Sequence, residues 1–132
     1  VGNNAAVGNI ISTLLFPDKV YYTQFSLQTK EQPYGINIEL NNEIGKEHQV
    51  EQAPNTFYFE INACILFSLI ENVDYISFDL VNEKSDRLTF DYTRAWAEEM
   101  VGKALWEEGE SQESYKQLMS LLNEKLWYRT NQ

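Results

Sequence analysis

The chain has 132 residues, of which 43% are hydrophobic and 14% aromatic, and its formal net charge at pH 7 is −10. The length and the apolar content fit one globular domain with its own core and exclude a wholly disordered chain. The acidic balance argues against binding to nucleic acid or to an anionic membrane surface, because both require clustered Lys and Arg.

The first third of the chain predicts a helix followed by two strands. Residues 4–15 (NAAVGNIISTLL) place apolar side chains at helical spacing, although the interior Gly8 costs a helix about 1 kcal/mol relative to Ala. Residues 20–29 favour a strand, and EQPYG at 31–35 is typical of a turn. Residues 36–40 (INIEL) alternate between apolar and polar side chains and predict the second strand.

The polar segment 41–54 predicts a loop, after which the same order of elements returns. Residues 55–71 predict a helix with apolar side chains on more than one face, which is typical of a deeply buried helix. Cys64 lies in this helix, and we expect a buried structural thiol rather than a nucleophile. Two further strands are predicted over 74–81 and 88–92.

An eight-residue pattern, V-x-Y-x-x-F-x-L, opens each predicted strand pair, as VYYTQFSL at 20–27 and VDYISFDL at 73–80. The chain therefore carries two helix–strand–strand units, about 4–40 and 55–92, within a single domain of residues 1–132. Neither hairpin can bury a hydrophobic face alone. We expect an α+β fold in which the two units form a four-stranded antiparallel sheet with helices mainly on one face.

The last part of the chain, about 93–129, predicts further helices. After an acidic run at 107–110, Ser111 is a candidate N-cap for the last helix. The apolar residues of that helix recur at helical spacing and indicate a face that packs on the core: Tyr115, Leu118, Met119, Leu122 and Leu126. No apolar run in the sequence is long enough to cross a bilayer, because Glu60 and Asn62 interrupt the longest candidate.

Because side chains alternate across a strand, the pattern also assigns the faces of the sheet. Phe25 and Phe78, the phenylalanines of the repeated motif, are expected to face one core. The opposite face is expected to be polar, with the motif tyrosines at equivalent places. It supplies the candidate site for a ligand or partner: Tyr22, Tyr75, Gln24, Asn37, Asp79 and Asp91. The alternative is that the two tyrosines only pack against the loop at 41–54.

No catalytic motif occurs in the sequence. His48 and Cys64 are the only histidine and cysteine, too few for a zinc site, and no EF-hand, phosphate-binding loop or nucleophile elbow is present. Neighbouring acidic residues such as Glu98 and Glu99 indicate solvated carboxylates rather than a catalytic pair. We therefore expect no cofactor, no metal and no enzyme activity. A small acid-dependent hydrolase and a protein-interaction or inhibitory module remain the alternatives.

Three stretches of the sequence, VGNNAAVGNIISTLLFP, FSLQTKEQPYGINIEL and NACILFSLIENVDYISFDL, resemble one family of bacterial domains, and VGNN is the most distinctive piece. That uncharacterised family occurs in the extracytoplasmic parts of Gram-positive membrane proteins, some of which carry a BlaR-type metallopeptidase module. The resemblance implies an extracytoplasmic location, a membrane tether outside these residues, and a noncatalytic binding or sensing role. The family has no established catalytic residues to carry over.

Overall fold

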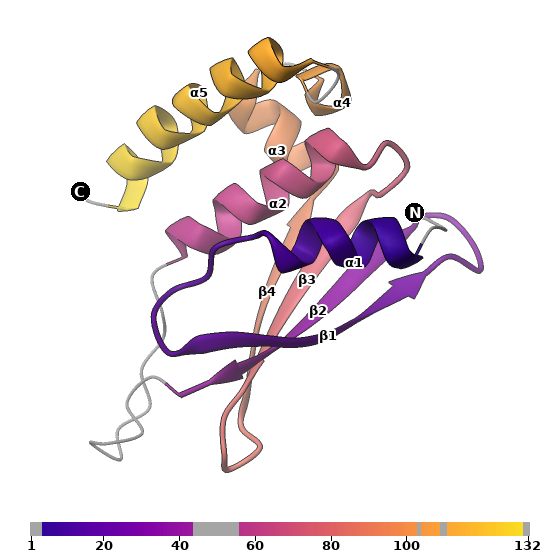
Figure 1. The fold of residues 1–132 in the computed structure, drawn as a ribbon, viewed down its shortest axis with the longest axis vertical. Helices are drawn as coiled ribbons and strands as arrows, with labels where there is room; N and C mark the ends of the chain where they lie inside the picture. The colour runs from indigo at the N-terminus through magenta and orange to yellow at the C-terminus, as the bar shows by residue number, and fades with distance from the viewer. Residues whose placement is uncertain (1–3, 44–55, 103, 109–110, 131–132) are drawn as a thin grey trace.

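The computed structural model describes residues 4–43, 56–102, 104–108 and 111–130. Both predicted helix–strand–strand units are present, and C-terminal helices follow them (Figure 1). The α+β fold predicted from the sequence is therefore confirmed. In chain order the elements are α1 (Asn4–Ser12), β1 (Val20–Gln28), β2 (Gly35–Asn42), α2 (Phe57–Leu69), β3 (Tyr75–Val81), β4 (Arg87–Thr93), α3 (Arg94–Val101), α4 (Leu105–Glu108) and α5 (Gln112–Thr130).

The four strands form one sheet in the order β1-β2-β3-β4, and its central pair differs from the prediction. The outer pairs β1–β2 and β3–β4 are antiparallel, but β2 and β3 run parallel, from Gly35 opposite Tyr75 to Asn41 opposite Val81. The fully antiparallel sheet was wrong because a helix separates the hairpins: α2 carries the chain back along the sheet, so β3 starts at the same end as β2. The repeated strands β1 and β3 consequently run in opposite directions.

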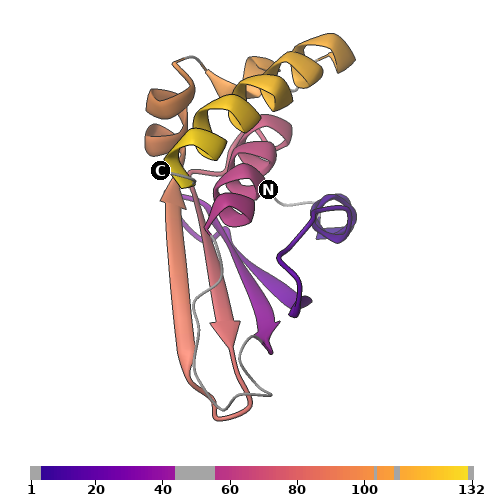
Figure 2. The ribbon, with the colours of Figure 1, turned by 90° about the vertical axis from the view of Figure 1, so that its left-hand side faces the viewer.

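Helix α2 lies at the centre of the molecule, between the sheet and the C-terminal helices (Figure 2). It contacts α3, α4 and α5 as well as β4, and every residue from Phe59 to Ser68 is buried. This explains why its apolar residues are not confined to one stripe. Cys64 is fully buried within it, as predicted. Burial, and then the charge of Glu60, raise the pKa of the thiol to about 12, so Cys64 stays protonated at neutral pH.

The centre of the core is a cluster of aromatic rings around Phe78. The Phe78 ring centroid lies 5.3 Å from that of Phe59, 6.0 Å from that of Tyr92 and 6.3 Å from that of Phe16. Phe59 in turn stacks on Phe90, with centroids 5.1 Å apart. Since these rings come from α2, β3, β4 and the α1–β1 connection, this cluster joins the second unit to the first.

Phe25, which matches Phe78 in the repeated motif, faces the same core but is only half-buried. Its ring packs beneath α1 at Gly8, where an added Cβ would lie 3.2 Å from the ring atom Cε1. This close approach accounts for a glycine in the interior of α1. The motif phenylalanines therefore share a face, as predicted, but not a degree of burial.

The C-terminal helices begin directly after β4. The Thr93 hydroxyl accepts a hydrogen bond from the backbone N–H of Trp96 and caps α3, which ends at Gly102 with φ of +87°. In α5, Leu118 and Leu122 are buried and Tyr115 and Met119 half-buried, which agrees with this part of the predicted apolar stripe. Its last member, Leu126, lies outside the side chains that the structure describes. In the part of the chain that the structure describes, none of the helices combines the length and apolar character needed to cross a membrane.

Candidate functional site

The sheet face that points away from the helices is polar, and hydrogen bonds join side chains of neighbouring strands across it. The Gln24 amide donates to the Glu39 carboxylate at 2.7 Å and links β1 to β2. The Asn37 amide donates to Asp79 at 2.9 Å and links β2 to β3. The Ser77 hydroxyl donates to Asp91 at 2.5 Å and links β3 to β4. The polar candidates predicted on this face are thus on it, and they contact one another or their neighbours.

Asp79 is the most connected carboxylate on this face. Besides Asn37, the Thr89 hydroxyl donates to it at 2.6 Å, and the Arg87 guanidinium lies 3.0 Å from it. Burial alone would raise the pKa of Asp79, but the hydrogen bonds from Thr89 and Asn37 and the charge of Arg87 outweigh it, so the pKa is lowered. Asp79 is therefore held ionised, which suits a structural acceptor and not a general acid.

Replacing Asp79 should make stability depend less on acid pH. Because its folded-state pKa lies below the ordinary 3.8, its stabilisation is complete above that value and is lost as pH falls through the folded-state pKa. The Asp79→Asn variant should lose about 1–2 kcal/mol of unfolding free energy at pH 7, and this loss should shrink below about pH 4. Urea unfolding at pH 7 and pH 3 measures both values. Asp91→Asn, at an exposed position, is the control; a loss equal to that of Asp79→Asn would contradict the prediction.

Tyr22, a candidate for this polar face, lies on the other side of the sheet. A β-bulge between Tyr22 and Gln24 shifts the register, so Tyr22 pairs with Leu40, a core residue, and is half-buried. Burial raises the pKa of its hydroxyl. Tyr21 is opposite Asn41 instead and is 51% exposed. The expectation that Tyr22 and Tyr75 occupy equivalent places was therefore wrong, because the bulge reverses the alternation in β1 alone.

Tyr75 does lie on the polar face, as predicted. Its ring lies over Gly35 of the neighbouring strand, where an added Cβ would be 2.0 Å from the ring atom Cζ. Glycine at the start of β2 is thus what leaves room for the ring. The alternative role for the tyrosines, packing against the loop at 41–54, falls mostly outside the described residues.

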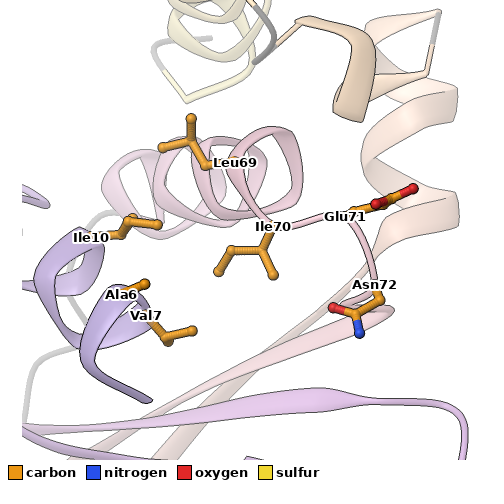
Figure 3. Close-up of a pocket in the computed structure, with 7 residues that line it drawn as sticks. All are labelled: Ala6, Val7, Ile10, Leu69, Ile70, Glu71 and Asn72. Atoms are coloured by element: carbon orange, nitrogen blue, oxygen red, sulfur yellow. The ribbon is translucent and has the colours of Figure 1, made fainter. Parts of the chain in front are cut away.

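A hollow that the sequence did not suggest lies between α1 and the C-terminal end of α2 (Figure 3). Its volume is about 360 Å³. Val7 and Ile70 are buried in its walls, whereas Glu71 and Asn72 are exposed at one end. We call it the α1–α2 groove, and its lining residues are Ala6, Val7, Ile10, Leu69, Ile70, Glu71 and Asn72.

Arg94, the first residue of α3, holds the turn that forms the polar end of this groove. Its Nε donates to the carbonyl of Val73 at 2.9 Å and its Nη2 to the carbonyl of Ile70 at 2.6 Å. The guanidinium lies over the Phe67 ring at 5.2 Å from the centroid and 4.0 Å from Glu98. Burial lowers the pKa of Arg94, and nearby carboxylates oppose that shift. A cation that binds carbonyls at the end of a helix fixes the backbone there, so the groove end is preformed.

Comparison with known proteins finds a family match for the part of the chain that contains both helix–strand–strand units. A family model described as a domain of unknown function, DUF4825, matches residues 1–93, from the N-terminal residues to the end of β4. Neither a protein of curated function nor a solved structure matches the chain. The matched residues are more than two thirds of the sequence, and helices α3 to α5 lie beyond them. The chain therefore belongs to the DUF4825 family of uncharacterised domains.

Proposed function

We propose that the chain is a noncatalytic binding or sensing module whose ligand site is the α1–α2 groove. The observation that carries this proposal is the combination of apolar walls with a polar end, in a volume of about 360 Å³. Small-ligand sites are concave, mostly apolar, and carry a few polar groups that set orientation, within about 300–1,000 Å³. On the polar sheet face, by contrast, the candidate side chains Gln24, Asn37 and Asp91 are engaged in hydrogen bonds between neighbouring strands.

The state of Asp79 supports a binding role over the acid-dependent hydrolase. Hydrolysis by paired carboxylates needs one acid with a raised pKa, which donates its proton to the leaving group. Asp79 has a lowered pKa and three donors around it. Asp91 accepts from Ser77 on the same face. Both carboxylates join neighbouring strands of the sheet. We therefore favour a binding module over an acid-dependent hydrolase.

The location that we propose is extracytoplasmic, in a membrane-anchored protein of a Gram-positive bacterium. The support for this location is the resemblance of the VGNN and NACILFSLIENVDYISFDL segments to domains that accompany BlaR-type metallopeptidases. In that setting, the groove would take its ligand from outside the cell. An epitope tag in the exposed β3–β4 turn, at Lys84, should bind antibody on intact cells that express the full protein; binding only after lysis would contradict the location.

Filling the groove should abolish ligand binding without unfolding the domain. Ala6 is exposed at its rim, so the Ala6→Phe variant places a ring in the opening and leaves the core intact. With n-hexanol as an apolar probe, backbone amide shifts in NMR spectra should move at Val7, Ile10 and Ile70. Ala6→Phe should weaken the affinity at least about tenfold, since the ring occupies the volume that the probe needs.

The neighbouring Ala5 provides a matched control. It is also exposed on α1 but does not line the groove, so Ala5→Phe adds the same ring to the same helix and should leave hexanol binding unchanged. Unfolding midpoints of the two variants should agree with that of the parent chain. Hexanol shifts confined to other regions, or an undiminished affinity in Ala6→Phe, would remove the groove as the ligand site.

A further inference from the structure

We propose that the ligand of the α1–α2 groove is a small cationic amphiphile, with an apolar chain or ring that ends in a charged amine. This inference rests on the proposed function, because it names the class of ligand for that same groove.

The size of the groove favours a small molecule over a protein partner. Its volume of about 360 Å³ lies near the lower limit of small-ligand sites. A stable protein–protein interface buries roughly 800 Å² on each partner, far more than seven lining residues at one helix end provide. Figure 3 shows Ala6, Val7 and Ile10 of α1 on one side of the hollow and Ile70 on the other. An apolar body fits between them.

The charge at the end of the groove selects the head group. Among the described residues that line it, Glu71 is the only one with a charge. Glu71 is exposed, and Figure 3 shows its side chain directed away from the hollow, so an amine that extends past the end of the groove would meet its carboxylate in water. Asn72, beside it, contributes an amide at the same end.

Arg94, close to this end, does not cancel the negative charge. Three carboxylates act on its guanidinium, those of Glu98, Asp74 and Glu71. Its Nε and Nη2 donate to the backbone of the α2–β3 turn. Because the guanidinium is engaged with these groups, Glu71 remains the charged side chain that lines this end of the groove, in a chain whose total charge is −10. An anionic ligand would therefore be repelled and a cationic one attracted.

The expected preference is modest, because the ion pair forms at an exposed mouth. Exposed ion pairs change an equilibrium by roughly 1.5- to 5-fold. At 1 M salt the Debye length falls to about 3 Å, which screens such a pair almost completely. The apolar walls should therefore supply most of the affinity, and the charge should decide between ligands of equal apolar size.

Three probes with one six-carbon chain separate these contributions: n-hexylammonium, n-hexanol and n-hexanoate. At pH 7 and low salt, NMR titration should rank their affinities in that order, with hexylammonium roughly 2- to 5-fold tighter than hexanol. The Glu71→Gln variant should bring hexylammonium to the level of hexanol and leave hexanol unchanged. Glu99→Gln, which removes an exposed carboxylate of α3 that does not line the groove, should keep the preference. In the parent chain, the preference for hexylammonium over hexanol should disappear when 1 M NaCl is added.

The results of this titration test the cationic ligand separately from the proposal that the groove is a binding site. Hexanol that binds in the groove as tightly as hexylammonium would overturn the cationic ligand and keep the groove as a binding site. Failure of all three probes to bind at Val7, Ile10 and Ile70 would overturn the proposed function and this inference together.

Discussion

The Phe78→Ala variant should lose about 3–5 kcal/mol of unfolding free energy, a large part of the stability of a domain of this size. Phe78 is fully buried and contacts the rings of Phe16, Phe59 and Tyr92. Removing its ring leaves a cavity enclosed by two strands and α2, where the surroundings cannot close in. Urea unfolding measures the loss through the midpoint, provided that the slope stays constant.

The matched control is Phe25→Ala, at the same position of the repeated motif. Phe25 is half-buried between β1 and α1, so its loss should cost less, roughly 1–3 kcal/mol. If Phe78→Ala does not fold, Phe78→Leu keeps most of the apolar volume and should still be less stable than the parent chain. A loss for Phe25→Ala that equals or exceeds the loss for Phe78→Ala would contradict the arrangement of the core described above.

The repeated motif predicted both strand pairs because alternation is a local property of the chain. INIEL at 36–40 and the V-x-Y-x-x-F-x-L pattern each fix which side chains share a face within one strand. The motif carries no information on the direction in which one hairpin meets the next. That direction depends on the helix between them, since α2 returns the chain to the end of the sheet where β2 began. The pattern over 55–71 predicts this helix but not its role as the crossover between two parallel strands.

The position of Tyr22 shows how one residue can defeat an argument from periodicity. The extra residue, Thr23, interrupts the pairing of β1 with β2. On the N-terminal side of this bulge, the side chains that alternation assigns to the polar face turn toward the core, so Tyr21 and Tyr22 exchange faces. Beyond the bulge, Gln24 and Phe25 follow the predicted alternation. A bulge leaves no compositional mark in VYYTQFSL, and so nothing in the sequence indicated the exchange.

The groove could not be predicted from local patterns, because its two walls are about sixty residues apart in the chain. Val7 and Ile10 belong to an apolar stripe that is typical of a core-facing helix, and they do face the core side. The hollow lies between α1 and the end of α2, two helices that no local pattern in the sequence places side by side. Only the three-dimensional arrangement shows that Ile70 and Glu71 complete the site.

The Arg94→Met variant should lose roughly 2–4 kcal/mol, the other large effect that the structure predicts. Methionine keeps the apolar length of the side chain over Phe67 but donates no hydrogen bonds. The carbonyls of Ile70 and Val73 then lose charge-assisted partners, and Glu98 loses its nearby cation. Glu98 also accepts from the backbone N–H of Leu105 at 2.7 Å, so amide hydrogen exchange at Leu105 should quicken as well.

Two further variants show whether the stability lost in Arg94→Met depends on the position of the guanidinium or only on its charge. Arg94→Lys keeps the charge, but its single ammonium cannot reproduce the planar geometry that reaches both carbonyls, so its stability should fall between the parent chain and Arg94→Met. Arg87→Met removes an arginine whose side chain is 54% exposed beside Asp79, and it should cost less than about 1 kcal/mol. Equal losses for Arg87→Met and Arg94→Met would mean that net charge matters and position does not. The expected ranking would instead make Arg94 the residue through which α3, beyond the DUF4825 match, fixes the turn at the end of the groove.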